Sequence, residues 1–149
     1  MKFLKKTYKI WFSWLTTKRA HLPRKEMEDT SFKSVGERSD IITAIENNET
    51  ELWLAPGQAE GSIQGYYILT HLTKTGLLAK CADLEELKVI QTKGIDFFRR
   101  HFAENCIFGW RDVQQDKVPY LLEFDGWLVI WWDTLGNEMS KRHTSLHRK

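Results

Sequence analysis

The sequence predicts an α+β fold in which a mostly antiparallel sheet of about five or six strands packs on about three or four helices. Three observations lead to this prediction. Two strongly apolar runs flank Asp125-Gly126, which is typical of a β-hairpin. Residues 84–102 carry apolar side chains at helical spacing. Strand-like and helix-like segments are partly segregated along the chain, whereas a parallel sheet requires strict alternation.

Composition fits one domain with a substantial core. The chain has 149 residues, 42% are hydrophobic and 13% are aromatic. This length is common for a single domain. The two cysteines, Cys81 and Cys106, form neither a disulfide framework nor a zinc motif. We therefore expect reduced thiols and a cytoplasmic protein. Attachment to the inner face of the membrane is an alternative that depends on the first residues of the chain, described below.

Charge is distributed unevenly. The net charge is +2, yet residues 1–25 carry eight Lys and Arg and no acid. Residues 137–149 carry four basic side chains against one acid, so residues 26–136 hold a net charge of −9. An acidic body with basic ends favours a basic partner for the body and makes nucleic acid an unlikely partner.

Residues 1–20 are predicted to form a basic amphipathic helix. Their apolar side chains recur on one helical face, and four lysines lie on the opposite face. The apolar run is interrupted, too short to span a bilayer, and lacks the cleavage site of a signal peptide. The helix could pack on its own domain, bind a partner or lie on an anionic membrane surface. The membrane alternative rests on Lys2, Lys5, Lys6, Lys9, Trp11 and Trp14.

The rest of the chain divides into three parts. Residues 21–38 are polar and contain Pro23 and Gly36, which indicates a linker or an irregular segment. Residues 39–136 are expected to form a single α+β domain. Residues 137–149 are basic and are expected to be a frayed tail.

The first half of the domain is predicted to alternate helix, strand and loop. Ser39 is a candidate N-cap of a short helix that ends at Asn47. A strand is expected over 51–55, followed by a turn or loop over 56–62. Residues 63–73 are rich in β-formers and are predicted to be a strand.

Two helices and a hairpin are predicted next. Asp83 is expected to cap one helix and Thr92 a second one. A strand over 105–112 precedes a hairpin over 118–133. The second strand of the hairpin is apolar on both faces, which predicts either a central strand or an exposed aromatic patch.

No motif in the sequence specifies a cofactor or a metal. The phosphate-binding loop, the dinucleotide fingerprint, HExxH and GxSxG are all absent. His143 and His147 are four residues apart but have no third ligand nearby in the sequence, so no metal site is expected. The basic cluster Arg99-Arg100-His101 lies between phenylalanines at core spacing, which argues against nucleic-acid binding.

A Cys–His pair is the one enzymatic possibility. Cys81 or Cys106 could meet His71 or His101, but a nucleophilic thiol needs a nearby base and an orienting group. Cys106 lies in an apolar predicted strand, where a thiol is usually inert. We therefore do not expect an enzyme.

Charge and aromatic content favour a protein-binding module, most concretely an immunity protein that occludes the active site of a basic toxin such as a nuclease. The alternatives are a membrane-surface protein and a small enzyme with a Cys/His site. The residues assigned to partner binding are Glu46, Glu49, Glu51, Trp53, Glu60, Tyr66, Trp110 and Trp132.

Overall fold

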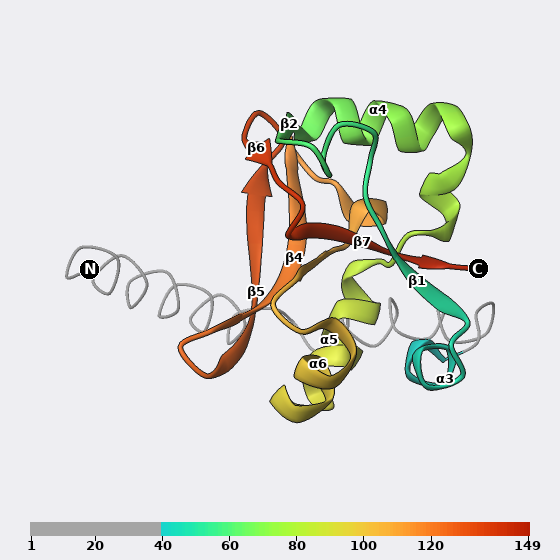
Figure 1. The fold of residues 1–149 in the computed structure, drawn as a ribbon, viewed down its shortest axis with the longest axis vertical. Helices are drawn as coiled ribbons and strands as arrows, with labels where there is room; N and C mark the ends of the chain where they lie inside the picture. Colours follow the sequence, from blue (N-terminus) through green and yellow to red (C-terminus); the bar gives the residue numbers. More distant parts are fainter. Residues whose placement is uncertain (1–39) are drawn as a thin grey trace, which may run out of the picture. The chain divides into compact units, whose positions relative to one another are not determined.

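A five-stranded sheet lies at the centre of the part of the chain that the structure describes. The structure is a computed structural model that describes residues 40–149 (Figure 1). The predicted helix over 1–20 and the predicted linker over 21–38 lie outside the described residues. Within them, four α-helices accompany the five-stranded sheet and a separate two-stranded sheet. The expected mixed α and β architecture is confirmed.

The sheet is antiparallel except at one junction. Its strands, in spatial order, are β1 (Thr50–Trp53), β7 (His143–Arg148), β3 (Cys106–Phe108), β4 (Lys117–Phe124) and β5 (Trp127–Thr134). Only β3 and β7 run parallel. The small sheet pairs β2 (Ile63–Gln64) with β6 (Glu138–Met139). Among the described residues, β1 and β5 are therefore the two edges of the main sheet.

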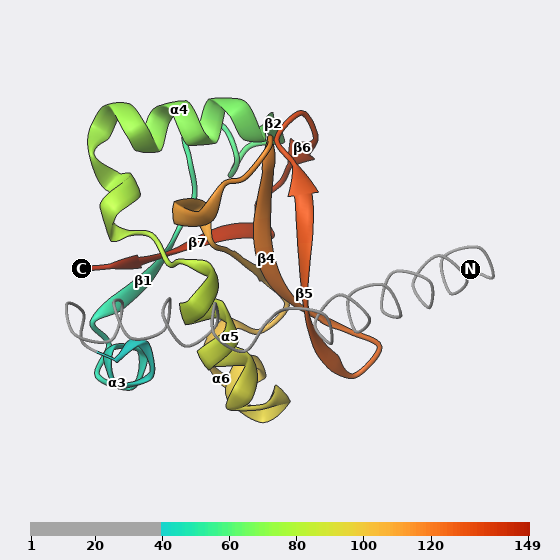
Figure 2. The ribbon, with the colours of Figure 1, turned by 180° about the vertical axis from the view of Figure 1, so that it is seen from behind.

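Helices cover both faces of the sheet. They are α3 (Ile41–Glu46), α4 (Gly65–Thr75), α5 (Leu84–Thr92) and α6 (Ile95–Phe102), with 3₁₀ turns at Leu77–Lys80 and Trp110–Asp112. Helix α4 lies on one side of the sheet, and α3, α5 and α6 lie on the other (Figures 1 and 2).

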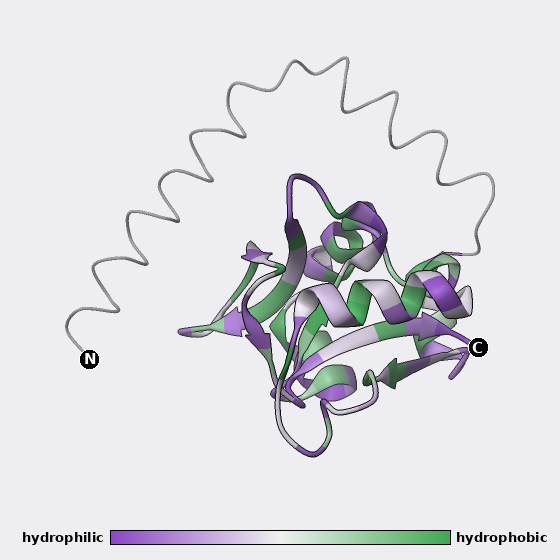
Figure 3. Cartoon of the chain, turned by 90° about the horizontal axis from the view of Figure 1, so that it is seen from above, coloured by the Kyte–Doolittle hydropathy of each residue, from purple (hydrophilic) through white to green (hydrophobic). Residues whose placement is uncertain are grey.

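Each face of the sheet carries its own apolar cluster. On the α5 and α6 side, Leu87 and Phe98 pack in one cluster with Leu121 of β4. On the α4 side, Ile68 and Leu72 belong to a cluster with Phe108, Trp110 and Met139 of the strands and turns. Hydrophobic residues follow the sheet and the helix sides that face it, while turns and loops are mostly hydrophilic (Figure 3).

The predicted hairpin is confirmed. Strands β4 and β5 pair over eight residues, from Lys117↔Thr134 to Phe124↔Trp127. Asp125 and Gly126 both have positive φ, 52° and 82°, as a two-residue type I′ turn requires. Of the two alternatives predicted for this strand, the central position is wrong, because β5 lies at an edge of the sheet. Val129 and Ile130 are buried, Leu128, Trp131 and Trp132 are partly buried, and Trp127 is 68% exposed.

The predicted strand over 63–73 is wrong beyond its first two residues. Residues 65–75 form α4, which buries Gly65, Ile68 and Leu72 on one side. The spacing of these residues by three and four matches a helix, and their burial outweighs the β-propensity of the neighbouring tyrosines.

The prediction of a frayed basic tail is also wrong. Residues 143–148 form β7, which lies inside the sheet between β1 and β3. All the described residues belong to one compact unit, so the proposed boundary at 136 does not separate a tail from the domain. The segment holds Thr144-Ser145-Leu146-His147, and all four residues are buried. The basic residues on either side of this segment led to the prediction of a polar tail, although the segment itself is a central strand.

The starts of α3, α5 and α6 lie within two residues of the predicted positions. Asp83 caps α5 as expected, and its carboxylate and the Glu86 carboxylate form a reciprocal capping box. Helix α3 begins after Asp40 instead of Ser39, and α6 begins after Gly94 instead of Thr92. The predicted strand over 105–112 stops at Phe108 and continues as the 3₁₀ turn.

Candidate functional site

An acidic–aromatic strip runs along one edge of the domain, from the end of α3 over β1 to α4. We define this strip by six residues: Glu46, Glu49, Glu51, Trp53, Tyr67 and His71. The three carboxylates and Tyr67 are exposed, and the Trp53 and His71 rings are half-buried. The strip thus joins charge and aromatic surface on neighbouring elements.

The three carboxylates are held by a tight turn between α3 and β1. Glu46 is the last residue of α3, and Asn48 adopts a positive φ of 57°. The Glu49 N–H donates to the Ala44 carbonyl at 2.8 Å, and its carbonyl accepts from the Lys149 N–H at 2.9 Å. These two bonds fix Glu49 between helix and strand, so the carboxylates are presented from an ordered backbone.

The aromatic part of the strip is built by stacking. The Trp53 ring of β1 stacks on His71 of α4, with ring centroids 5.7 Å apart, and on His147 of β7, at 4.8 Å. Tyr67 precedes His71 by one helical turn and is 67% exposed. Residues four apart share a helix face, so Tyr67 lies on the same face of α4 as His71.

Two cations lie near the acidic end of the strip. A shallow hollow of about 370 Å³ is lined by Ala44, Asn48, Glu49, Arg148 and Lys149. The Arg148 guanidinium is held by the Glu86 carboxylate, with Nη2 and Oε2 2.6 Å apart. Since Glu86 offsets the charge of Arg148, that arginine only weakly reduces the negative potential of the three carboxylates.

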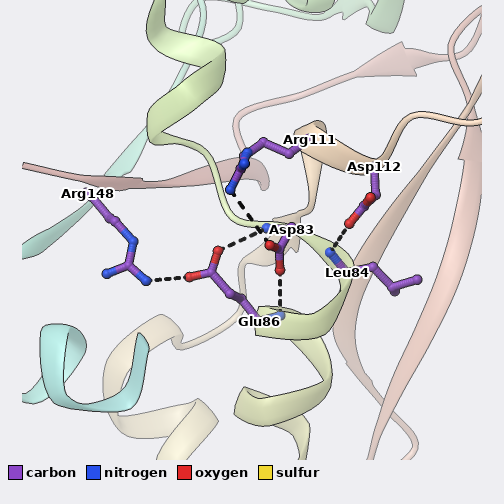
Figure 4. Close-up of polar contacts among 6 residues, drawn as sticks. All are labelled: Asp83, Leu84, Glu86, Arg111, Asp112 and Arg148. Carbon is purple, nitrogen blue, oxygen red and sulfur yellow. Dashed lines mark hydrogen bonds and ion pairs between the residues drawn. The ribbon is translucent and has the colours of Figure 1, made fainter. Parts of the chain in front are cut away.

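Arg148 belongs to a polar network that ties β7 to the start of α5 (Figure 4). Glu86 also accepts from the Asp83 N–H at 3.3 Å, and Asp83 accepts from the Glu86 N–H at 2.8 Å. Arg111 lies 3.7 Å from Asp83, and Asp112 accepts from the first N–H of α5. The network satisfies the Leu84 and Glu86 amides at the start of α5 and anchors the last strand. Its contacts give it a structural role.

Cys81 lies beside a histidine, but this histidine is His147 and neither of the two that the sequence predicted. The Cys81 Sγ lies 3.3 Å from the His147 Nε2, whereas His71 stacks on Trp53 and His101 contacts Phe97 on α6. Cys81 is 0% exposed and His147 is 1% exposed. A substrate therefore has no open path to this pair in the described fold.

Burial also sets the protonation of these groups. Burial lowers the pKa of His147 to about 4; the Glu51 charge opposes this change, and Lys80 adds to it. The imidazole is therefore neutral at pH 7 and does not supply the cation that would stabilise a thiolate. Burial likewise raises the pKa of the other thiol, Cys106, to about 11.

The predicted partner-binding residues do not form one surface. Glu46, Glu49, Glu51 and Trp53 lie together in the strip. Glu60 is exposed in the loop after β1. Gln58 holds that loop, because its side chain donates to the Ser140 and His143 carbonyls at 3.0 and 2.9 Å.

The remaining three predicted residues lie elsewhere. Tyr66 is exposed near the start of α4. Trp132 is half-buried on β5, at the opposite edge of the sheet. The assignment of Trp110 to partner binding is wrong, because Trp110 is 1% exposed and stacks on Phe108 in the core.

Residues 40–149 contain neither a metal-ligand cluster nor a membrane-spanning helix. In this part of the chain, no group of three or more His, Cys, Asp or Glu side chains is arranged to hold a metal ion. No helix of these residues has the length and apolar character needed to cross a membrane. Comparison with known protein families, curated proteins and solved structures finds no match to this chain.

Sequence reasoning missed Tyr67 and His71 as members of the strip. Their spacing of four places them on one face of a helix or of a strand, but the sequence does not show that this face lies beside Trp53. The Cys81–His147 contact carried no local signal, because the two residues are 66 positions apart in the sequence. Only the pairing of β7 brings His147 to Cys81.

Proposed function

We propose that this chain is a protein-binding module that occludes a basic site on a partner protein, most concretely the active site of a toxin such as a nuclease. The observation that carries the proposal is the acidic–aromatic strip. It combines three exposed carboxylates with an exposed tyrosine and a stacked tryptophan on ordered elements. In this proposal the chain is an immunity protein of the cytoplasm and needs no catalysis or cofactor of its own.

The two halves of the strip have different roles in binding. Glu46, Glu49 and Glu51 attract a basic cleft from a distance and raise the association rate. Tyr67 and Trp53 then supply contact area, since large rings with two side-chain torsions lose little entropy on binding. Binding through the strip therefore depends on salt through its rate of association and on the aromatics through its rate of dissociation.

The experiment is affinity capture from source cells with three forms of the full chain as bait. The forms are the wild type, a strip variant with Glu46→Gln, Glu49→Gln and Glu51→Gln, and a control. The control removes three exposed charges elsewhere, by Asp96→Asn, Glu104→Gln and Asp125→Asn. Both variants change the net charge equally, so a difference between them reports the location of the charges.

The proposal expects one stoichiometric basic protein bound by the wild type and by the control, and lost from the strip variant. Added salt should weaken this capture, because the attraction between exposed charges is screened. Equal capture by all three forms would assign binding to another surface. An empty capture together with turnover of a small substrate would favour the Cys/His alternative.

The membrane alternative rests on residues 2–15, which lie outside the described residues. It stays a prediction from the sequence pattern of lysines and aromatics. It expects the full chain to bind anionic vesicles and not neutral ones, with binding that fades as salt is added. A salt-independent lack of vesicle binding would contradict it.

A further inference from the structure

A set of hydrogen bonds joins the loop after β1 to the turn between β6 and β7, and we call it the Gln58 clamp. The Gln58 side chain is buried, and its amide nitrogen donates to the Ser140 and His143 carbonyls at 3.0 and 2.9 Å. Its oxygen accepts from the Ala55 N–H at 2.8 Å. Both N–H groups and the oxygen of this buried amide are therefore bonded, and two segments far apart in the sequence are held together.

The His143 ring closes the turn to which Gln58 is bonded. The Ser140 N–H donates to the His143 Nδ1 at 2.9 Å, and the His143 N–H donates to the Ser140 carbonyl at 3.0 Å. A backbone N–H can only donate, so Nδ1 carries a lone pair and the proton of the neutral ring is on Nε2. Because Gln58 bonds to the same Ser140 carbonyl, the ring, the turn and the loop form one connected unit.

We propose that His143 makes the Gln58 clamp sensitive to acid: a proton on Nδ1 opens the turn 140–142 and thereby releases the loop 54–62. A protonated Nδ1 is a donor, so it would face the Ser140 N–H with no acceptor between them. The open turn therefore takes up a proton more readily than the closed turn. As pH falls, proton uptake by the open form moves the equilibrium toward that form.

The Ser140 hydroxyl limits the size of this response. Its Oγ lies 3.2 Å from the His143 Nδ1 and can accept a hydrogen bond from the protonated ring. This contact gives the new proton an acceptor, but it leaves the Ser140 N–H without the one it had. Removal of the hydroxyl should therefore make the clamp more sensitive to acid.

Other titratable groups around the ring do not distinguish the two forms of the turn. They are Cys106 of β3, Tyr120 of β4, Asp133 of β5, and Lys141, Arg142 and Glu104 near the turn. Burial raises the pKa of Cys106 to about 11 and also raises the pKa of Tyr120, so both are neutral near pH 7. The groups on the strands act on the ring in both forms, whereas the Ser140 N–H meets Nδ1 only in the closed turn.

The clamp is separate from the surface proposed to bind a partner. Gln58, Ser140 and His143 lie outside the acidic–aromatic strip, so the inference does not rest on the proposed function.

The test is nuclear magnetic resonance of the full chain at about pH 7.5 and about pH 5, on either side of the ordinary imidazole pKa of about 6.5. The forms are the wild type, His143→Asn and Ser140→Ala. The asparagine oxygen takes the place of Nδ1 as an acceptor and does not titrate, which makes His143→Asn the matched control. The measured quantity is the protection of the residue 140 amide against hydrogen exchange, corrected for the intrinsic rate at each pH.

The wild type should lose about tenfold more protection than His143→Asn on acidification. The limit for an ordinary imidazole in the open turn is about thirtyfold at pH 5, and the Ser140 hydroxyl reduces it. Ser140→Ala should lose more protection than the wild type. The Gln58 side-chain amide should lose protection together with the residue 140 amide, because the two are parts of one unit.

Three results would overturn the proposal. The first is an equal pH response of the wild type and His143→Asn. The second is a Gln58 amide that stays protected while the residue 140 amide opens, because the turn would then open without releasing the loop. The third needs no variant: ring nitrogen shifts of the wild type that place the His143 proton on Nδ1 at about pH 7.5.

Discussion

The buried His147 contributes to the pH dependence of the free energy of unfolding, and His147→Gln should remove this contribution. Burial lowers the pKa of His147 from 6.5 to about 4 in the folded chain. Above pH 6.5 the imidazole is neutral in both states and has no effect on stability. Between pH 6.5 and pH 4 only the unfolded chain takes up the proton, so the free energy of unfolding falls as pH falls.

The size of this effect follows from the difference between the folded and the unfolded pKa. A tenfold difference in proton affinity corresponds to about 1.4 kcal/mol, and the whole difference is expressed only below the folded pKa. Between about pH 7.5 and about pH 5, proton binding to the unfolded chain costs at most about 2 kcal/mol of stability. We expect about 2 kcal/mol, because the folded pKa of about 4 already includes the attraction of the Glu51 carboxylate.

The assay is urea unfolding followed by tryptophan fluorescence at these two pH values. Carboxylates also titrate in this range, but their effect is common to the wild type and the variant and cancels in the difference. His147→Gln should lose about 2 kcal/mol less than the wild type on acidification. An equal pH response of His147→Gln and the wild type would refute the reasoning.

Three further predictions concern the packing of the fold, each measured by urea unfolding at neutral pH. Gly65→Ala should destabilise by about 1–3 kcal/mol, because its Cβ would lie 2.9 Å from the Leu135 carbonyl oxygen. An unchanged midpoint would contradict that contact. Trp110→Ala should cost about 3–5 kcal/mol through the cavity it leaves in the core. Arg148→Met should cost about 2 kcal/mol, because it removes a charged partner of the Glu86 carboxylate. Arg142→Met, whose ion pair with Glu104 is exposed, is the control and should cost less than about 1 kcal/mol.

Elements with strong local chemistry could be predicted from the sequence. Asp125-Gly126 specifies its turn through the positive φ that both residues tolerate, so the hairpin register followed. Asp83 and Glu86 form a capping box that depends only on residues three apart, and the start of α5 was found. In both cases, local conformation decides the structure without help from distant contacts.

Elements decided by distant contacts could not be predicted. The β-formers of 63–73 fold as α4 because Ile68 and Leu72 fill a cluster with Phe108 and Met139 from later strands. Strand β7 is short and rich in basic and polar residues, and only pairing on both sides makes it central. Composition also gives no distinction between a buried tryptophan such as Trp110 and an exposed one.

Only part of the acidic–aromatic strip could be predicted from the sequence. Its carboxylates and Trp53 lie within eight residues, so their proximity follows from the chain itself. Tyr67 and His71 join them only because α4 packs against β1 through the Trp53 stack. A surface shared by two elements depends on tertiary packing, which periodicity alone does not specify.

The central claim is that the strip neutralises a basic partner by occlusion. Its most direct test is a titration of the captured partner's activity with the purified chain. The account predicts complete inhibition at one molecule per partner, retained by the Asp96, Glu104 and Asp125 control and lost by the Glu46, Glu49 and Glu51 variant. A partner that remains fully active when it is saturated with the wild-type chain would contradict the account.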